Sequence, residues 1–240
     1  MQTLAKIRVI VTRPEPEASA FAEMLAARGI AAILSPVMAV RFLDIRPDIA
    51  AVGTVAFTSV NGVRAYCASG GSRGATAFAV GEKTAAAAHR AEFDRVLTAA
   101  GDVAALARTI AGTLSTAADV LHVVGQDEAG DLVGALRAAG LKARHAVGYA
   151  ADAAPELSDL VVSALKACSP GLWVAHFSAR SAGLFRELTA KVGLQDQLRH
   201  VRAACLSPSV ARAAGGVWAH VAIAGSPDAE ALIDAILKAK

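Results

Sequence analysis

The sequence predicts an α/β fold made of two similar lobes. Short apolar runs alternate with segments of helical periodicity along nearly the whole chain, which is typical of parallel sheets covered by helices on both faces. Two stretches of the chain also resemble each other, which predicts a duplicated unit. Of the 240 residues, 55% are hydrophobic, so the chain can bury a large core, and this excludes a disordered protein.

The opening segment shows how each element is predicted. Ile7–Val11 is a short apolar run, which predicts a strand. Glu17–Arg28 predicts a helix, because Phe21 and Leu25 recur at helical spacing and Gly29 stands just past the end. The same criteria predict further strands at Ile30–Leu34, Val55–Phe57, Ala77–Val80, Arg95–Thr98, Asp119–Val124, Ala143–Tyr149, Trp173–Phe177, Val201–Cys205 and Val217–Ala224. They predict further helices at Val60–Ala68, Glu82–Arg90, Val103–Leu114, Asp131–Ala139, Pro155–Cys168, Ala179–Val192, Pro208–Ala214 and Asp228–Leu237.

Two segments without helical period are predicted to be extended connectors. Pro36 and Pro47 bracket the first, Val37–Arg46, and the second, Ala146–Ala154, ends at Pro155. Proline disfavours helical conformation in the residue before it, so both segments are interpreted as extended chain.

The internal resemblance places similar chemistry in both halves. Phe57–Tyr66 matches His176–Phe185: each is a strand end, a hydroxyl residue and a helix that carries an aromatic side chain. Further along, Asp102-x-x-Ala105-Leu106 matches Asp228-x-x-Ala231-Leu232. The repeat alone suggests a tandem split near residue 116, with two α/β lobes and a cleft between them.

Charge and cysteine usage exclude several classes of protein. The net charge is only +3 and no Lys/Arg cluster is interleaved with aromatics, so we expect no nucleic-acid partner. No run reaches the roughly 18 apolar residues of a membrane span, and the opening residues do not form a secretory signal. We therefore expect a cytoplasmic protein with three reduced, mostly buried cysteines, namely Cys67, Cys168 and Cys205.

The common catalytic signatures are missing. The sequence has no G-x-G-x-x-G, no P-loop and no G-x-S-x-G, which argues against a common dinucleotide site, a nucleoside-triphosphate site and a hydrolase nucleophile. The histidines lack metal-ligand spacing, so each is expected to be hydrogen-bonded or solvent-facing. They are His89, His122, His145, His176, His200 and His220.

Small hydroxyl residues and glycines follow the predicted strands, often with a cation nearby. In open parallel sheets ligands bind outside the carboxyl ends of the strands, and helix N-termini there favour anions. Two lobes with such ends suit a ligand with many carboxylates or phosphates, whereas helix capping alone would explain any single residue. The segments are Thr12–Pro14, Thr58–Gly62, Gly81–Thr84, Gly125–Gln126, Ser178–Ser181 and Ser207–Ser209.

An ordered set of these segments resembles the uroporphyrinogen-III synthase family and covers nearly the whole chain. The matching motifs are Val11-Thr12-Arg13-Pro14, Phe57-Thr58-Ser59-Val60-Asn61-Gly62-Val63, Val80-Gly81-Glu82-Lys83-Thr84-Ala85, Phe177-Ser178-Ala179-Arg180-Ser181-Ala182 and Cys205-Leu206-Ser207-Pro208-Ser209-Val210-Ala211.

The resemblance implies two parallel-sheet, flavodoxin/Rossmann-like lobes joined by a two-stranded antiparallel linker. Lobe one would comprise residues 1–36 and 152–240, and lobe two residues 41–147. The linker would comprise residues 37–46 and 146–154. This arrangement agrees with the tandem repeat if the lobes exchange their opening β-α-β units.

The resemblance also implies an activity. The family cyclises hydroxymethylbilane, a linear tetrapyrrole with eight carboxylates, to uroporphyrinogen III. The reaction eliminates water and inverts ring D, and it belongs to heme biosynthesis. It uses no cofactor and no metal, and the family expectation is a monomer. Because spontaneous closure gives the wrong isomer, the protein mainly has to hold a flexible polyanion in one shape.

Ten residues are carried over from the family as contacts with acetate and propionate groups. They are Thr12, Arg13, Thr58, Ser59, Asn61, Lys83, Ser178, Ser181, Ser207 and Ser209. Tyr149 matches a family tyrosine, and its hypothesised role is to donate a proton or hydrogen bond to the departing hydroxyl; packing at the lobe junction is the alternative. One departure stands out, because Ala129-Gly130-Asp131 replaces a frequent Gly-Arg pair. An aspartate near an octa-anion is unfavourable, so this loop is expected either to lie off the site or to bind differently.

Two other functions remain open on the sequence alone. A non-catalytic two-lobed binder of a small polyanion would share the same strand ends. A nucleotide-dependent transferase or oxidoreductase would need a phosphate-binding loop, which the sequence does not contain.

Overall fold

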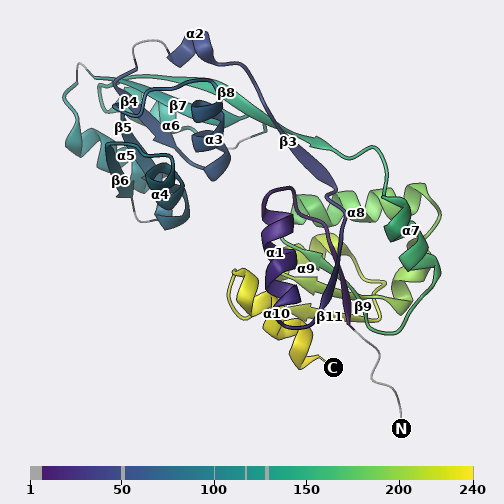
Figure 1. The fold of residues 1–240 in the computed structure, drawn as a ribbon. Coiled ribbons are helices and arrows are strands. Elements are labelled where there is room, and N and C mark those ends of the chain that lie inside the picture. The colour runs from purple at the N-terminus through teal and green to yellow at the C-terminus, as the bar shows by residue number, and fades with distance from the viewer. Residues whose placement is uncertain (1–6, 50–51, 100, 117, 128–129, 240) are drawn as a thin grey trace. The chain divides into compact units, whose positions relative to one another are not determined.

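The computed structural model describes residues 7–49, 52–99, 101–116, 118–127 and 130–239. The chain divides into two units (Figure 1). Unit 1 is Met1–Ala39 with Asp152–Lys240, and unit 2 is Val40–Ala151. Each unit contains a sheet with helices packed on it, so the predicted α/β class is confirmed.

Unit 1 contains a five-stranded sheet in which all strands are parallel. Its strands are β1 (Arg8–Val11), β2 (Ala31–Leu34), β9 (Leu172–His176), β10 (Arg202–Cys205) and β11 (His220–Ile223), in the spatial order β11-β10-β9-β1-β2. Its helices are α1 (Glu17–Ala26), α7 (Asp159–Lys166), α8 (Ala179–Lys191), α9 (Pro208–Ala214) and α10 (Ala229–Lys238), with a 3₁₀ helix, η1 (Gln195–His200).

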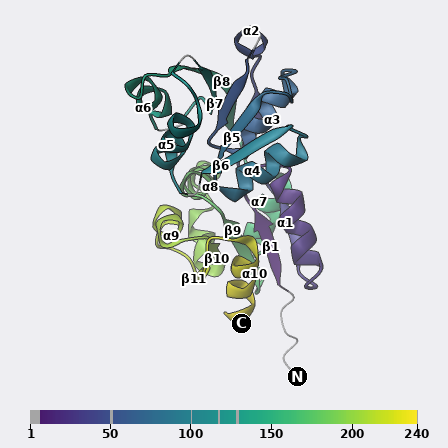
Figure 2. The same ribbon diagram turned by 90° about the vertical axis from the view of Figure 1, so that its left-hand side faces the viewer.

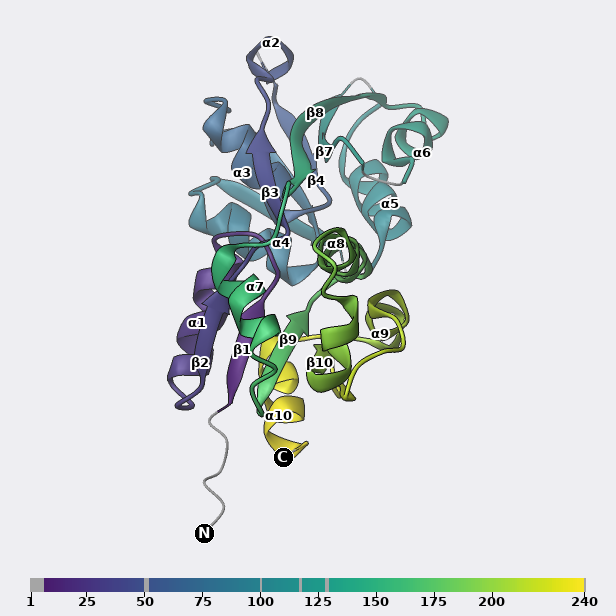
Figure 3. The same ribbon diagram turned by 90° about the vertical axis from the view of Figure 1, so that its right-hand side faces the viewer.

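Helices cover both faces of the unit 1 sheet (Figure 3). Phe21 of α1 and Ile233 of α10 pack with Val9 on one face. Phe185 of α8 and Val161 of α7 pack on the other. Alternate residues of each strand therefore belong to different core clusters, as the two-residue side-chain period of a strand requires.

Unit 2 contains a six-stranded sheet in the order β3-β8-β7-β4-β5-β6. Its strands are β3 (Met38–Phe42), β4 (Thr54–Phe57), β5 (Thr76–Val80), β6 (Arg95–Ala99), β7 (Asp119–Gly125) and β8 (Lys142–Ala153). Strands β4 to β8 pair in parallel. Its helices are α2 (Arg46–Ile49), α3 (Val60–Ala68), α4 (Gly81–Arg90), α5 (Val103–Thr113) and α6 (Leu132–Ala138).

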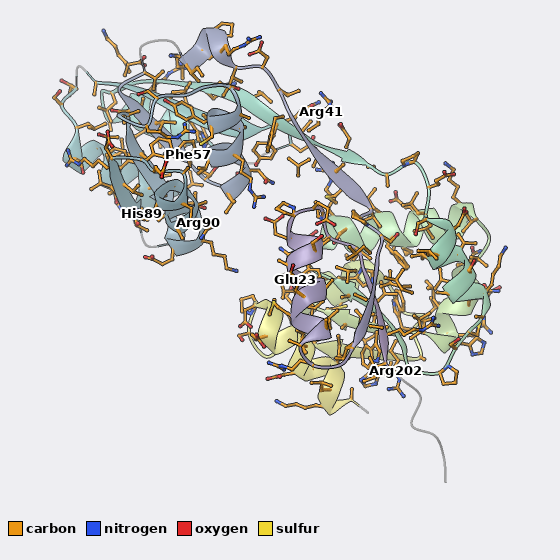
Figure 4. The ribbon with its side chains drawn as sticks, in the orientation of Figure 1. Glu23, Arg41, Phe57, His89, Arg90 and Arg202 are labelled. Atoms are coloured by element: carbon orange, nitrogen blue, oxygen red, sulfur yellow. The ribbon has the colours of Figure 1, made fainter. Side chains whose placement is uncertain are left out.

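The unit 2 sheet is also covered on both faces (Figure 2). Helices α3 and α4 pack on the face that contains Phe57, which is labelled in Figure 4. Phe57, Tyr66 and Phe93 contact one another there. Helices α5 and α6 pack on the face that contains Phe78. Most other core positions in both units are Ala, Val, Leu or Ile.

The five parallel strands of unit 2 and the five strands of unit 1 have the same spatial order when the internal repeat is used to align them. In unit 2 the order is β8-β7-β4-β5-β6, and in unit 1 it is β2-β1-β9-β10-β11. The β1-α1-β2 segment of unit 1 thus occupies the position that β7-α6-β8 occupies in unit 2. The tandem repeat along the chain and the exchange of the opening β-α-β segments between the two units therefore describe the same arrangement.

The chain passes between the units inside β3 and β8, which occupy most of the two predicted connectors. The amide of Leu43 donates to the carbonyl of Gly148 (2.8 Å), and the amide of Ala154 donates to that of Val37 (2.9 Å). Residue numbers rise on one strand as they fall on the other, which is the direction of an antiparallel pair. The connector prediction missed that Arg46 begins helix α2.

Two predicted elements differ from the structure, and one element of the structure was not predicted, each for an identifiable reason. The last strand begins at His220 rather than Val217, because the Trp218 indole donates to the Ala214 carbonyl and stacks on Phe185. Helix α7 begins at Asp159 rather than Pro155, because the preceding Leu157 is buried in the core. The 3₁₀ helix η1 was not predicted, since its six residues are too short to show a period.

The cysteines agree only partly with the expectation that they are reduced and mostly buried. The three cysteines are all free thiols, but Cys67 and Cys168 are only partly buried. Burial raises the pKa of the Cys205 thiol to about 11, so that thiol is a small apolar core group.

None of the helices in the described residues is long and apolar enough to cross a membrane.

His176 contradicts the expectation that each histidine is hydrogen-bonded or solvent-facing. Its side chain is fully buried at the end of β9, and within the described part of the chain neither ring nitrogen has a hydrogen-bond partner. The ring packs edge-on against Phe185 and Trp218, with centroids 5.5 Å away in both cases. Burial lowers the pKa of His176 to about 3, because the charged form cannot be solvated there.

We predict that His176 makes unit 1 sensitive to acid. Between about pH 6.5 and pH 3 the unfolded chain binds a proton at this residue and the folded chain does not, so stability falls as pH falls, by up to about 1.4 kcal/mol per pH unit. Urea unfolding followed by tryptophan fluorescence measures it, because both tryptophans, Trp173 and Trp218, lie in unit 1.

The His176→Phe variant should lose this part of the pH dependence and the His89→Gln variant should keep it. His89 is exposed on α4 in unit 2 and provides the control (Figure 4). Identical differences between pH 7.5 and pH 5 in His176→Phe and in the unchanged protein would contradict the assignment.

Candidate functional site

The predicted residues of unit 1 lie at one edge of its sheet. Strands β1, β9 and β10 are neighbours and parallel, so their carboxyl ends share an edge. The strand order reverses between β1 and β9, because β2 lies on one side of β1 and the later strands lie on the other. Such a switch point is where ligands bind in open α/β sheets. Thr12 and Arg13 follow β1, and Ser178 follows β9 directly after Phe177.

Arg13 is the best-placed cation of this edge. Its guanidinium carbon lies 4.3 Å from the centre of the Phe177 ring, which itself packs edge-on against Phe21. Burial lowers the pKa of Arg13 from its ordinary value, and nearby Glu17 partly restores it. An arginine remains charged under these conditions, so the guanidinium stacked on Phe177 is a fixed positive group.

Thr12 differs from the expectation of a substrate contact. Its side chain is fully buried, and its hydroxyl donates to the carbonyl of Ala175 at 2.8 Å. This hydrogen bond links the chain after β1 to β9 across the switch point. The Thr12 hydroxyl therefore supports the position of Arg13 in this structure and faces no solvent.

The serines of unit 1 are helix caps. Ser178 is the N-cap of α8 and forms a capping box with the buried Ser181, with 3.1 Å between the Ser181 amide nitrogen and the Ser178 Oγ. Ser207 is the N-cap of α9, and its Oγ lies 2.9 Å from the Oγ of Ser209. Capping, the alternative for each single site, is thus confirmed for Ser178 and Ser207. Ser178 and Ser209 are exposed, and Ser207 is half-buried.

Unit 2 repeats the arrangement at a switch point between β4 and β7. Here β5 and β6 lie on one side of β4, whereas β7 and β8 lie on the other. Thr58 and Ser59 follow β4, and Gly125 ends β7. The Thr58 hydroxyl lies 3.1 Å from the Nε2 of His122, a β7 residue that is only 4% exposed.

Ser59 and Tyr149 come together in this unit. Ser59 is the N-cap of α3, where its Oγ accepts from the Gly62 amide at 3.1 Å, and the same Oγ lies 2.9 Å from the Tyr149 hydroxyl. A capping hydroxyl uses a lone pair for the amide and keeps its own proton, so this contact with a second hydroxyl is compatible with the cap. The structure thus joins the proposed catalytic residue to a proposed binding residue.

Gly125 makes room for Tyr149. A Cβ atom on Gly125 would lie 2.7 Å from carbons of the Tyr149 ring and 2.9 Å from its hydroxyl oxygen. The pairing of β7 with β8 is also irregular here, and the register shift brings Gly125 opposite Tyr149. The missing side chain and the irregular register together set the place of the phenol.

Asn61 and Lys83 complete the predicted set of unit 2. Asn61 lies in the first turn of α3, and its Oδ1 accepts from the Arg64 guanidinium at 3.3 Å. Lys83 is exposed in the first turn of α4. Both follow strands of the same sheet edge as Thr58 and Ser59.

The departure from the family pattern has a structural explanation. Asp131 is the N-cap of α6, and its carboxylate accepts from the Gly134 amide at 2.7 Å. Ala129 of the same motif lies outside the described residues. The residue that sequence reasoning missed is His122, although a histidine inside the apolar run Val120–Val124 was a usable signal of a buried polar contact.

The described residues contain no cluster of three His, Cys, Asp or Glu side chains that could hold a metal ion. The site is instead a set of hydroxyl, amide and cationic groups at two sheet edges. Such groups bind and orient an anionic ligand.

Comparison with known proteins decides the family. A family model described as uroporphyrinogen-III synthase HemD matches residues 19–234. The chain belongs to the uroporphyrinogen-III synthase family. Membership gives it the heme-biosynthesis synthase function of that family, so the predicted family and function are confirmed.

Solved synthases share the fold. The chain is similar to uroporphyrinogen-III synthetase from Helicobacter pylori 26695, with TM-score 0.63 and 16% identity over 98% of this chain and 100% of that chain. It is also similar to a mutant uroporphyrinogen III synthase from the extremely thermophilic bacterium Thermus thermophilus, with TM-score 0.53 and 18% identity over 98% and 100%. No curated protein sequence matches the chain.

We predict that the Gly125→Ala variant of this synthase loses activity while it stays folded. The added methyl group must displace the Tyr149 ring, which breaks the contact between the Tyr149 and Ser59 hydroxyls. Turnover and melting temperature, measured together, separate the two effects. The control is Gly53→Ala, because nothing lies within 4 Å of a Cβ atom there. Equal turnover in both variants would refute a need for this tyrosine position.

Proposed function

We propose that this synthase cyclises hydroxymethylbilane to uroporphyrinogen III, with loss of water and inversion of ring D, and that the reaction needs no cofactor. The observation that carries the proposal is the family match together with two sheets whose switch points are flanked by hydroxyl, amide and cationic side chains. A substrate with eight carboxylates needs many such groups.

We propose that residues from both units bind these carboxylates. Arg13 and Lys83 supply charge. Donors for hydrogen bonds come from Thr58, Ser59, Asn61, Ser178, Ser207 and Ser209. The buried Ser181, whose hydroxyl donates to the Ser178 carbonyl, acts indirectly by holding the capping box. The buried Thr12 acts indirectly by holding the turn that carries Arg13.

Tyr149 is the proposed catalytic residue. The C–O bond of the hydroxymethyl group breaks, the pyrrole nitrogen supplies the electron pair, and the hydroxyl leaves as water with a proton from the Tyr149 phenol. The azafulvene that results is attacked by the substituted carbon of the terminal pyrrole. This forms a spirocyclic intermediate, which fragments and recloses with ring D inverted, and the proton that the ring system then loses returns to the phenolate. Ser59 holds the phenol in place.

A cytoplasmic monomer is the proposed state of the protein. Three free thiols support a reducing compartment.

We predict that incubation with hydroxymethylbilane, followed by oxidation and separation of the porphyrins, yields mainly the type III isomer. The protein has to hold the chain in the shape that presents the substituted carbon, because closure in buffer gives type I. Only type I product would refute the enzyme and would favour a non-catalytic polyanion binder.

We predict that Tyr149→Phe lowers turnover by about a hundredfold, the low end of the effect of a positioned proton donor, and raises the type I fraction. The matched control is Tyr66→Phe in the same unit, whose hydroxyl donates a long hydrogen bond, 3.4 Å, to the Ser72 carbonyl. Unchanged turnover in Tyr149→Phe would remove the phenol from the mechanism.

A further inference from the structure

Unit 2 contains a cavity beside its switch point that the predicted contacts leave unused. Its volume is about 330 Å³, at the small end of ligand sites. It lies at the carboxyl end of β7 and beside β8, and it reaches the first turn of α6. Its lining comprises His122, Val124, Gly125, Gln126, Gly130, Asp131, Val133, His145 and Val147.

The register between β7 and β8 places two histidines side by side in the lining of the cavity. His122 of β7 pairs with His145 of β8, so both imidazoles lie on the same face of the sheet. His122 is 4% exposed and lies 3.1 Å from the Thr58 hydroxyl, whereas His145 is exposed. The cavity is thus continuous in structure with a residue proposed to bind substrate.

The apolar part of the cavity is a set of three valines. Val124 and Val147 come from the same two strands, two residues beyond the histidines, and Val133 comes from α6. Branched aliphatic walls suit the faces of a flat ring. A cavity of this volume suits one ring rather than a four-ring chain.

Asp131 determines which kind of ring fits. A carboxylate in the wall accepts hydrogen bonds and repels other carboxylates, so the cavity is unsuited to an anion alone. It suits a ring whose edge carries an N–H donor. The imidazoles of His122 and His145 and the amide of Gln126 can donate to carboxylates attached to that ring.

We propose that this cavity is the binding site for one pyrrole ring of the tetrapyrrole substrate, with the pyrrole N–H facing the carboxylate side and the acetate or propionate arms facing the histidines. This inference rests on the proposed function. Asp131, which the family comparison marks as unfavourable next to an octa-anion, becomes an acceptor for the ring nitrogen.

The test places a larger side chain in the cavity at Val147, an exposed residue of its lining. Val147→Phe adds a ring at a position that is 36% exposed, so folding is not at risk, and Val221→Phe on β11 of unit 1 is the control, at 38% exposed. Val147→Phe should raise KM for hydroxymethylbilane about tenfold or more, while Val221→Phe leaves it unchanged. The second variant, His145→Leu, removes a donor at the surface and should raise KM by a smaller factor.

Direct binding separates this inference from the proposed function. A monopyrrole with one acetate and one propionate is titrated into the full-length protein and its variants. If the unchanged protein makes type III product but Val147→Phe has the KM of Val221→Phe, the cavity proposal is overturned. If the protein makes only the type I isomer, the proposed function fails, and the monopyrrole titration still tests the cavity proposal. Weaker monopyrrole binding to Val147→Phe than to the unchanged protein supports the pyrrole site. Equal binding to the two proteins, or no binding to either, refutes it.

Discussion

The hydrogen bonds that cap the helices after the central strands are the constraint on which the site depends. Ser59, Ser178 and Ser207 each accept from an amide in the first turn of the helix that follows a strand end. Each cap contributes only about 1 kcal/mol, so its energetic share of the fold is small. Each cap matters more for the geometry of the site, because it holds a serine hydroxyl at the carboxyl edge of the sheet. A second hydroxyl lies within 3.0 Å of each one, on Tyr149, Ser181 or Ser209.

The duplication explains why both sheets present the same chemistry. In unit 1 the β1-α1-β2 segment comes first in the chain, whereas its counterpart β7-α6-β8 comes last in unit 2. Both sheets keep one strand order, so both keep a switch point with a serine-capped helix beside it. The chain passes between the units inside β3 and β8, as it must if each unit contains an opening segment and a later one.

Much of this could be predicted from sequence, and the limits have physical causes. Alternating apolar and helical periods located nearly every element, because each face of each sheet is buried and the pattern is strong. Element ends failed where a single side chain overrides the pattern, as Trp218 does by binding the end of α9. The contact of His122 with Thr58 fits the expectation of a hydrogen-bonded histidine. The sequence analysis missed that His176 is buried and lacks a hydrogen-bond partner within the described residues, because this is a property of packing that no local spacing records. The carboxyl-edge residues were predictable because parallel strands force their ends together, whereas the contact between Ser59 and Tyr149 depends on an irregular register and on the missing side chain of Gly125.

The chemistry of the caps separates structural helix ends from ligand-binding ones. A serine cap accepts from the helix and still donates its own proton, so it can bind an anion, whereas an aspartate cap can only accept. Asp102 and Asp228 cap α5 and α10, which follow the outermost strands β6 and β11. The serine caps follow β4, β9 and β10, at or next to the switch points. Asp131 breaks this division, because it caps the helix after β7, directly beside the switch point of unit 2. An acceptor beside the switch point suits a donor on the ligand, and in a polycarboxylate tetrapyrrole the only ring-borne donors are the pyrrole N–H groups.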